Sequence, residues 1–278
     1  MAFSYGPMLE AMCYVVIYLN YGGLFSDRVK SGRYNPLSLI LDSLLKGSLS
    51  DIVADATEMS LQIYPEPKSE GEGGNKFFRN GSRKSIVFAI IIMVLIEGED
   101  ATLGGVLALI QDREALLKHA QWAAGTLKQT NGMTAQLPIF GTEWATSGQH
   151  TPDEIARFAD HLAGMGASLA KLMEAPDSRT FDSFIEGTIG EMADFNITSR
   201  AHQITQSSDL RFSQLKTSQR PMAVFMMGDT SRPDANRKNI EIATSNMFKE
   251  IMRETDGRRN VYVLANEVTN FLINRIAT

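Results

Sequence analysis

Two apolar, β-favouring runs stand about two hundred residues apart in this chain, and this separation constrains its fold more than any other feature. The first run is Cys13–Leu19 and the second is Met222–Met227. Both are continuous rather than alternating, which is the pattern of a strand buried on both faces of a parallel sheet. A third run, Val261–Leu264, follows the second after a long helical pattern. The chain therefore predicts one sheet built from strands that are distant in sequence.

The residues between the first two runs are mostly helical in pattern. Apolar residues recur at helical spacing, and several stretches begin with cap signals, such as Thr151-Pro152-Asp153-Glu154 and Asn35-Pro36. The longest apolar run, Ile86–Ile96, is about half the roughly 20 residues that span a bilayer, so it predicts a buried core helix. The predicted helices are Ser38–Leu49, Asp51–Ile63, Arg113–Leu127, Thr151–Met173, Thr180–Phe195 and Asn236–Arg253.

The predicted order is strand, helical block, strand, helix, strand. The last three elements form a βαβ unit, which implies a parallel sheet with a right-handed crossover. The sequence thus predicts an α/β fold with a large α-helical insertion. We place the first part of the α/β domain at residues 1–64, the inserted all-α domain at 65–180 and the second part at 181–278.

Composition removes several classes of function. Among 278 residues there is one cysteine, so neither a disulfide framework nor a cysteine zinc cluster forms within the chain. The four histidines show no metal-ligand spacing. The net charge of −5 gives no support for nucleic-acid binding by the chain as a whole.

The stretch Val261–Phe271 contains the candidate catalytic residue. Its predicted strand ends just before Asn266 and Glu267. In open α/β sheets ligands bind at the carboxyl ends of the strands, where a carboxylate acts as a base or holds a metal-bound water. The alternative interpretation is a buried strand that ends in a polar turn. Arg79 and Arg83, before the apolar run, are either contacts for a partner or DNA or part of a solvated face.

Four segments resemble one family in their order and spacing. They are Tyr34-Asn35-Pro36-Leu37, the Phe77–Arg83 segment (Phe-Phe-Arg-Asn-Gly-Ser-Arg), Phe181–Phe212 and Met222–Phe271. The chain resembles the type IV secretion coupling proteins, the TraG/TraD-like conjugative DNA-transfer ATPases. Tyr34–Leu37 is similar to the Asn-Pro-Leu after the strand that follows the phosphate loop. The second and third segments are similar to the entry to the family's all-α domain and the return from it.

The resemblance implies a partial RecA-like P-loop NTPase parallel sheet with a large inserted all-α domain. It also implies ATP and Mg²⁺ as cofactors, with Glu267 as the general base and Asn266 on the Mg²⁺ side. The implied partners are a relaxase, single-stranded DNA, secretion-channel proteins and further copies of the chain in a hexamer. The implied location is the cytoplasmic face of the bacterial inner membrane.

Three departures from the family bear on activity. The chain has no G-x-x-x-x-G-K-[ST] phosphate loop, and Asn266 stands where the family has an aspartate. Asn20-Tyr21-Gly22-Gly23 replaces an acidic Asp-Pro-Lys-Gly-like turn. The family pattern places these residues in the middle of a longer coupling protein, without its membrane anchor.

Three functional hypotheses follow. The first is a coupling-protein-like component of a conjugation machine that is deficient as an ATPase in this form. The second is an active ATPase with an unrecognised phosphate site. The third is an unrelated α/β structural or interaction module with no nucleotide chemistry. A basic face on the helical block favours the first hypothesis over the third, and a nucleotide beside Glu267 favours the second.

Overall fold

The computed structural model describes residues 2–23, 28–46, 48–66, 76–129, 150–175, 179–229 and 233–263. The chain divides into two compact units. We call Met1–Pro36 with Gln203–Thr278 the α/β unit, and Leu37–His202 the helical unit. The inserted unit is thus larger than the residues 65–180 expected from the sequence. It takes in the helices before residue 65 because these pack on one another and on the central helix of the insertion.

In the part of the α/β unit that the structure describes, two parallel strands form the sheet. β1 (Val15–Asn20) pairs with β2 (Met222–Met227), with Val15 opposite Met222 and Asn20 opposite Met227. β2 coincides with the predicted run Met222–Met227, and β1 lies within Cys13–Leu19 except for its last residue, Asn20. The two strands pair directly although about two hundred residues separate them in sequence. Three helices accompany them in this unit: α1 (Ala2–Ala11), α11 (Gln214–Thr217) and α12 (Pro233–Arg253). A fourth, α10 (Arg200–Thr205), carries the chain across the boundary between the units.

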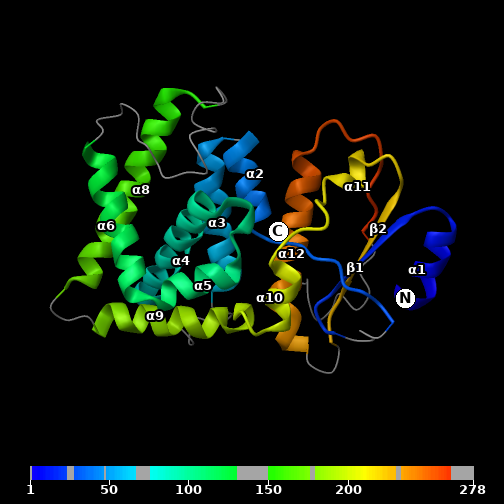
Figure 1. Cartoon of the computed structure of the whole chain (residues 1–278), viewed down its shortest axis with the longest axis horizontal. Coiled ribbons are helices and arrows are strands. Elements are labelled where there is room, and N and C mark those ends of the chain that lie inside the picture. Colours follow the sequence, from blue (N-terminus) through cyan, green and yellow to red (C-terminus); the bar gives the residue numbers. More distant parts are fainter. Residues whose placement is uncertain are drawn as a thin grey trace. The chain divides into compact units, whose positions relative to one another are not determined.

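One face of the sheet packs against α12 and encloses the core of the α/β unit (Figure 1). Alternate strand residues Ile17, Leu19, Val224 and Met226 point to this face, as the two-residue period of a strand requires. The fully buried members of the core also include Tyr34 and Phe212, whose ring centroids lie 4.5 Å apart. The helix supplies Ile240, Ala243, Met247 and Ile251.

The predicted third strand is not present in the part of Val261–Leu264 that the structure describes. Val261–Val263 belong to no strand, and Tyr262 and Val263 are 83% and 47% exposed. β-branched and aromatic residues favour a strand only where neighbouring strands or helices pack against them. The described residues of this run are largely exposed and lack such packing. Leu264 and the residues after it, Asn266 and Glu267 included, lie outside the described residues.

The two segments through which the α/β unit connects to the insertion are hydrogen-bonded side by side. Tyr34 N donates to Ile204 O and Asp209 N donates to Arg33 O, each at 2.9 Å. Asn35 N donates to Ser208 Oγ at 2.9 Å, and the helix predicted to start at Asn35-Pro36 begins at Ser38. These bonds hold the outgoing and returning segments together, so β1 and β2 can pair although the helical unit lies between them in sequence.

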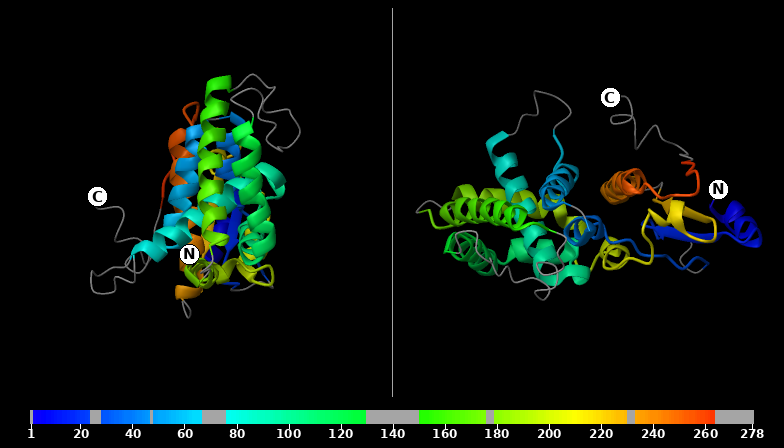
Figure 2. Two further views of the ribbon diagram at one scale, coloured as in Figure 1. Left: turned by 90° about the vertical axis from the view of Figure 1, so that its left-hand side faces the viewer. Right: turned by 90° about the horizontal axis from the view of Figure 1, so that it is seen from above.

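The helical unit is built around one buried helix, α4 (Lys76–Glu97), which packs against α3, α5, α8 and α9 (Figure 2). Ile86–Ile92, Val94 and Leu95 are buried within it, which confirms the predicted core helix. Helices α6 and α8 run antiparallel beside each other. The elements of this unit are α2 (Ser38–Lys46), α3 (Leu49–Ile63), α4, the 3-10 turn Gly98–Asp100, α5 (Leu103–Gln111), α6 (Arg113–Gln129), α8 (Pro152–Met173), α9 (Arg179–Met192) and the 3-10 turn Ala193–Phe195.

Side-chain caps set the first residues of three of these helices. Thr151 and Glu154 form the predicted reciprocal capping box at the start of α8. Thr102 accepts from Gly105 N at 2.9 Å, and Ser48 caps α3. In the described part of the chain, no helix combines the length and the apolar character needed to cross a membrane.

Candidate functional site at the carboxyl edge of the sheet

β1 and β2 end at the same edge of the sheet because they are parallel, and two glycine turns meet there. Gly22 N donates to Met227 O at 3.1 Å. A Cβ on Gly22 would lie 2.4 Å from Asp229 N and 2.6 Å from Gly228 C, so only glycine fits against the second turn. The turns after the two strands are therefore in direct backbone contact.

Polar side chains at the end of β1, directly after it, and one turn along α12 from the Gly228 contact at Asn236 are almost fully buried. Asn20 is fully buried, and Tyr21 and Asn239 are each 2% exposed. The Tyr21 hydroxyl and both amide atoms of Asn239 are buried without a hydrogen-bond partner among the described residues. Since buried polar groups in proteins are nearly always hydrogen-bonded, these atoms mark places for water or for polar atoms of a ligand.

The chemistry of this edge is mainly neutral. Burial raises the pKa of Tyr21, so its hydroxyl remains protonated as a donor at neutral pH. Asn239 offers an amide donor and acceptor, and Asn236, which is 8% exposed, lies beside Gly228. Asp229 brings a carboxylate to the turn after β2. The described groups of this edge are suited to hydrogen-bonding a polar ligand, and among them Asp229 carries the charge.

The described groups of this edge differ from those of a phosphate-loop Mg²⁺–ATP site. A triphosphate needs backbone N–H groups and a lysine around its phosphates, and the chain lacks that sequence motif. Magnesium favours carboxylate ligands, and the described residues contain no group of three or more His, Cys, Asp or Glu side chains placed to hold a metal. The proposed roles of Asn266 and Glu267 stay predictions, because both residues lie outside the described ranges.

Sequence reasoning missed the buried polar groups of this edge. Tyr21 belongs to a segment whose Gly22-Gly23 pair predicts an ordinary turn, and Asn239 lies inside a predicted helix. One signal was present in the sequence. Asn236, Asn239 and Asn246 recur at three- and seven-residue intervals along α12, on the same face as its buried apolar residues.

A buried carboxylate on the same helix has a different role. Glu250 is 6% exposed, and its Oε1 accepts from the Tyr34 hydroxyl at 2.8 Å. Its Oε2 accepts from Phe212 N at 2.6 Å and from Ser213 N at 3.3 Å. Burial raises the pKa of Glu250, although these hydrogen bonds oppose the rise. Glu250 thus joins three parts of the α/β unit and has no position from which to act on a ligand.

Arg79 and Arg83 are not part of a solvated face. They are 7% and 8% exposed, and both pair with Glu66 in the segment after α3. Their position one turn apart on α4 directs both guanidinium groups to the same carboxylate.

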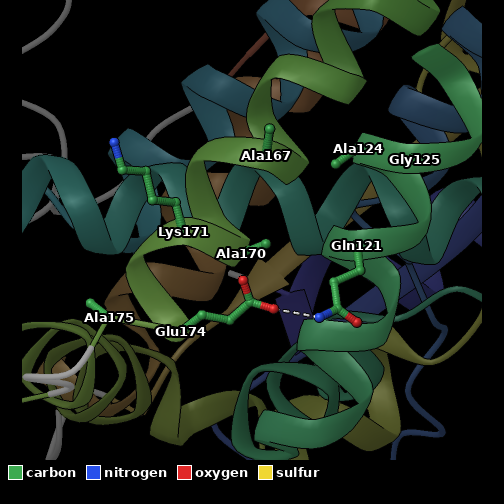
Figure 3. A pocket seen from close by; sticks show the side chains of 8 residues that line it. All are labelled: Gln121, Ala124, Gly125, Ala167, Ala170, Lys171, Glu174 and Ala175. Carbon is green, nitrogen blue, oxygen red and sulfur yellow. Dashed lines mark hydrogen bonds between the residues drawn. The ribbon is translucent and has the colours of Figure 1, made fainter.

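A groove lies between α6 and α8, and Figure 3 shows its lining. Its walls carry small residues, and Gln121 Nε2 donates to Glu174 Oε1 at 2.5 Å across it. Lys171 points away from this pair in Figure 3. The groove is lined by Gln121, Ala124, Gly125, Ala167, Ala170, Lys171, Glu174 and Ala175, a set that offers few reactive groups.

The two units differ in charge. The helical unit has thirteen Lys and Arg against twenty-two Asp and Glu, a formal net charge of −9. The α/β unit has fourteen against ten, a formal net charge of +4. The helical block is therefore acidic, which is the opposite of the basic composition that would favour DNA binding by it.

No protein-family model and no curated protein matches this chain. The likeness to coupling proteins accordingly rests on the sequence segments around Tyr34–Leu37, Phe77–Arg83, Phe181–Phe212 and Met222–Phe271.

Proposed function

We propose that this chain is a component of a conjugative DNA-transfer machine of the type IV secretion class, where it takes the part of a coupling protein without hydrolysing ATP in this form. One observation carries the proposal: two adjacent parallel strands, β1 and β2, are separated in sequence by a single all-α unit. That topology is the one expected from the family resemblance. It supports the resemblance independently of the motifs, because a chance likeness of short motifs does not require these strands to pair.

The proposed lack of ATP hydrolysis rests on the donor groups. A coupling ATPase needs a phosphate cradle and charged metal ligands at the carboxyl edge. The chain has no phosphate-loop motif, and Tyr21 and Asn239 supply neutral groups at that edge. Within this proposal the edge is a binding surface, and the chain contributes contacts rather than chemistry.

The difference in net charge between the two units suggests which unit binds which partner. Phosphate contacts supply most of the affinity of a protein for nucleic acid. The α/β unit, with its excess of basic residues, is the better candidate for single-stranded DNA, and exposed Arg28 and Lys30 lie in the segment after β1. The acidic helical unit is better suited to a basic protein surface, such as one on a relaxase or a channel protein.

Fluorescence anisotropy with a labelled single-stranded oligonucleotide tests the DNA-binding part. We expect binding that weakens steeply with salt, because it releases counterions from the phosphates. The double variant Arg28→Ala/Lys30→Ala should bind more weakly. The slope of its log binding constant against log salt concentration should be smaller in magnitude by about 2. Lys84→Ala is the matched control, since it removes an exposed cation from the helical unit. It should bind as the unmodified chain does.

Absence of single-stranded DNA binding at low salt would contradict the DNA-transfer role. It would instead favour an interaction module with no link to nucleic acid. Equal losses in Arg28→Ala/Lys30→Ala and Lys84→Ala would contradict the assignment of DNA to the α/β unit.

ATP turnover tests the second part of the proposal. We expect no Mg²⁺-dependent phosphate release above background from the purified chain. Turnover that Glu267→Gln abolishes would contradict the proposed deficiency and would make Glu267 the general base, as the family resemblance implies.

A further inference from the structure

The outer edge of β2 is open in the part of the sheet that the structure describes. Val15 N donates to Pro221 O at 2.8 Å, and the strand register starts with Val15 opposite Met222. Backbone groups of successive strand residues point to opposite sides, so the N–H and C=O groups of Met222, Val224 and Met226 point away from β1. No backbone hydrogen bond joins these three residues to another described segment on that side.

The opposite edge of the sheet is covered by the chain that follows β1. Gly32 N donates to Tyr18 O at 2.8 Å, and Ser31 Oγ accepts from Asn20 N at 3.0 Å. Among the described residues, the β2 edge has no such cover. An uncharged strand with an unpaired edge is a template for pairing with another strand, and Met222–Met227 carries no charge.

Apolar side chains are exposed beside this edge. Thr244 Oγ1 lies 3.7 Å from Met226 Sδ, so this side of α12 lies over β2. Phe248 and Met252 follow Thr244 at four-residue intervals on the same side of the helix, and they are 38% and 79% exposed. Met226 is only partly buried, whereas its pairing partner Leu19 on β1 is fully buried. The open edge therefore continues into apolar surface on the helix that packs over it.

We propose that a second copy of this chain binds at this edge, with the two β2 strands antiparallel about a two-fold axis at Val224. In this register Val224 faces Val224 of the partner subunit, and Met222 faces Met226 of the partner subunit. These are hydrogen-bonded pairs, and each exchanges two N–H···O=C bonds. The axis is perpendicular to the sheet, so both α12 helices lie on one face of the joined sheet. This brings Phe248 and Met252 of the two copies toward one another.

The charges at the two ends of β2 favour a second copy in this direction. Arg220 precedes the strand and Asp229 follows it, with no charged residue between them. In the antiparallel register Arg220 lies opposite Gly228 of the partner subunit, next to the partner's Asp229. Opposite charges thus meet at both ends, whereas parallel pairing would bring like charges together. The strand is complementary to itself, and the dimer does not depend on the proposed role in DNA transfer.

Sedimentation velocity of the whole chain, from low micromolar to near-millimolar concentration, tests the proposal. We expect a dimer that dissociates on dilution. Val224→Pro removes an outward N–H and no bond to β1, a place where an edge strand accepts proline. It should weaken the dimer by at least about tenfold, because each copy loses one bond across the axis. Val16→Pro is the matched control: it removes an outward N–H at the opposite edge of the sheet and should leave dimerisation unchanged.

A cysteine experiment tests the register without a proline. In a Cys13→Ser background, Ala223→Cys and Phe225→Cys place thiols on residues that face each other across the axis. Such non-hydrogen-bonded pairs have Cα atoms about 4.5 Å apart, within the range of a disulfide. A mixture of the two variants should form disulfide-linked dimers in oxidised glutathione. Neither variant alone should do so, because identical positions then lie diagonally, about 7–8 Å apart.

A chain that stays monomeric over the whole concentration range would overturn the proposal. A dimer that persists in Val224→Pro and gives no disulfide in the mixture would use another surface, which would overturn it as well. Equal disulfide yields in the mixture and in the single variants would contradict the antiparallel register at Val224.

Discussion

The Tyr34 hydroxyl donates a hydrogen bond to Glu250 Oε1 at 2.8 Å, although the two residues are 216 positions apart in sequence. Tyr34 is the last but two residue of the first segment of the α/β unit, and Glu250 lies on α12 in the second segment. Both side chains are buried. This bond fastens the two halves of an interrupted unit to each other.

Glu250→Gln should destabilise the chain by about 1–3 kcal/mol, because the NH2 group of Gln replaces one of two carboxyl oxygens that both accept from buried donors, and an NH2 group cannot accept a hydrogen bond. Burial raises the pKa of Glu250 in the folded chain, so the folded state binds this proton more tightly than the unfolded state does. The resulting stability is fully present below the unfolded value near 4.5 and is lost as the pH rises through the folded-state pKa. The cost of Glu250→Gln should therefore be largest at low pH.

Urea unfolding of the unmodified chain and of Glu250→Gln between pH 4 and pH 8 measures this difference. Tyr34→Phe is the companion variant, since it removes the hydroxyl and keeps the titrating carboxyl. A cost of Glu250→Gln that grows with pH would show that the carboxyl is not penalised by burial.

Gly164 and Gly166 on α8 should respond to alanine in opposite directions. A Cβ on Gly164 meets nothing within 4 Å, so Gly164→Ala should stabilise the helix by about 0.5–1 kcal/mol through lower backbone entropy. A Cβ on Gly166 would lie 2.6 Å from Ala120 O and 2.8 Å from Ala123 Cβ on α6. Gly166→Ala should cost about 1–3 kcal/mol by overpacking. Thermal unfolding of both variants gives the comparison, and effects of the same sign would show that α6 and α8 are not in this close contact.

Asn239→Leu should increase the free energy of unfolding if the buried amide of Asn239 serves to bind a ligand and does not stabilise the fold. Its amide atoms are buried without partners, and replacing such a group by an apolar one of similar size gains about 1–2 kcal/mol. The same variant should lose whatever ligand affinity the edge has. Denaturant unfolding, with Tyr21→Phe as a second removal of an unmatched hydroxyl, measures the change. A clear loss of stability in both variants would indicate ordered water that completes the structure.

Asp209 makes a pH-dependent contribution of the opposite sign. Hydrogen bonding from Arg33 lowers the pKa of Asp209 below its usual 3.8, so its stabilising effect is present above that value and is lost as the pH falls through the folded-state pKa. Asp209→Asn should therefore be less stable than the unmodified chain at pH 7 and should approach it at pH 2–3. The pair is exposed, with side chains 45% and 41% accessible, so added salt should reduce the difference. Arg33→Gln should remove most of the pH dependence.

The parallel sheet and its insertion followed from the sequence because a strand that is buried on both faces leaves a continuous apolar run. Cys13–Leu19 and Met222–Met227 carry that signal; β2 coincides with the second run, and β1 extends one residue beyond the first, to Asn20. Val261–Leu264 carries a similar but shorter signal, and its described residues form no strand. In a run of only four residues, packing against neighbouring elements decides whether a strand forms more than the β-propensity of the residues does.

The buried polar groups of the carboxyl edge were beyond prediction for another physical reason. Whether Tyr21 or Asn239 is buried depends on what packs over it, and a sequence pattern reports spacing along one element only. The same limit applies to Arg79 and Arg83. Their partner Glu66 precedes them by more than ten residues, in the segment after α3. Their burial depends on packing that no local pattern contains.

The separation of β1 from β2 also has a consequence during synthesis. β1 emerges from the ribosome about two hundred residues before its only neighbour in the described sheet, a delay of roughly 10–40 s at common elongation rates. The helical unit, whose contacts are closer in sequence, is completed within that interval. During this interval the apolar strand Val15–Leu19 has no strand to pair with. We therefore expect chaperone binding or incorrect pairing to involve this stretch first.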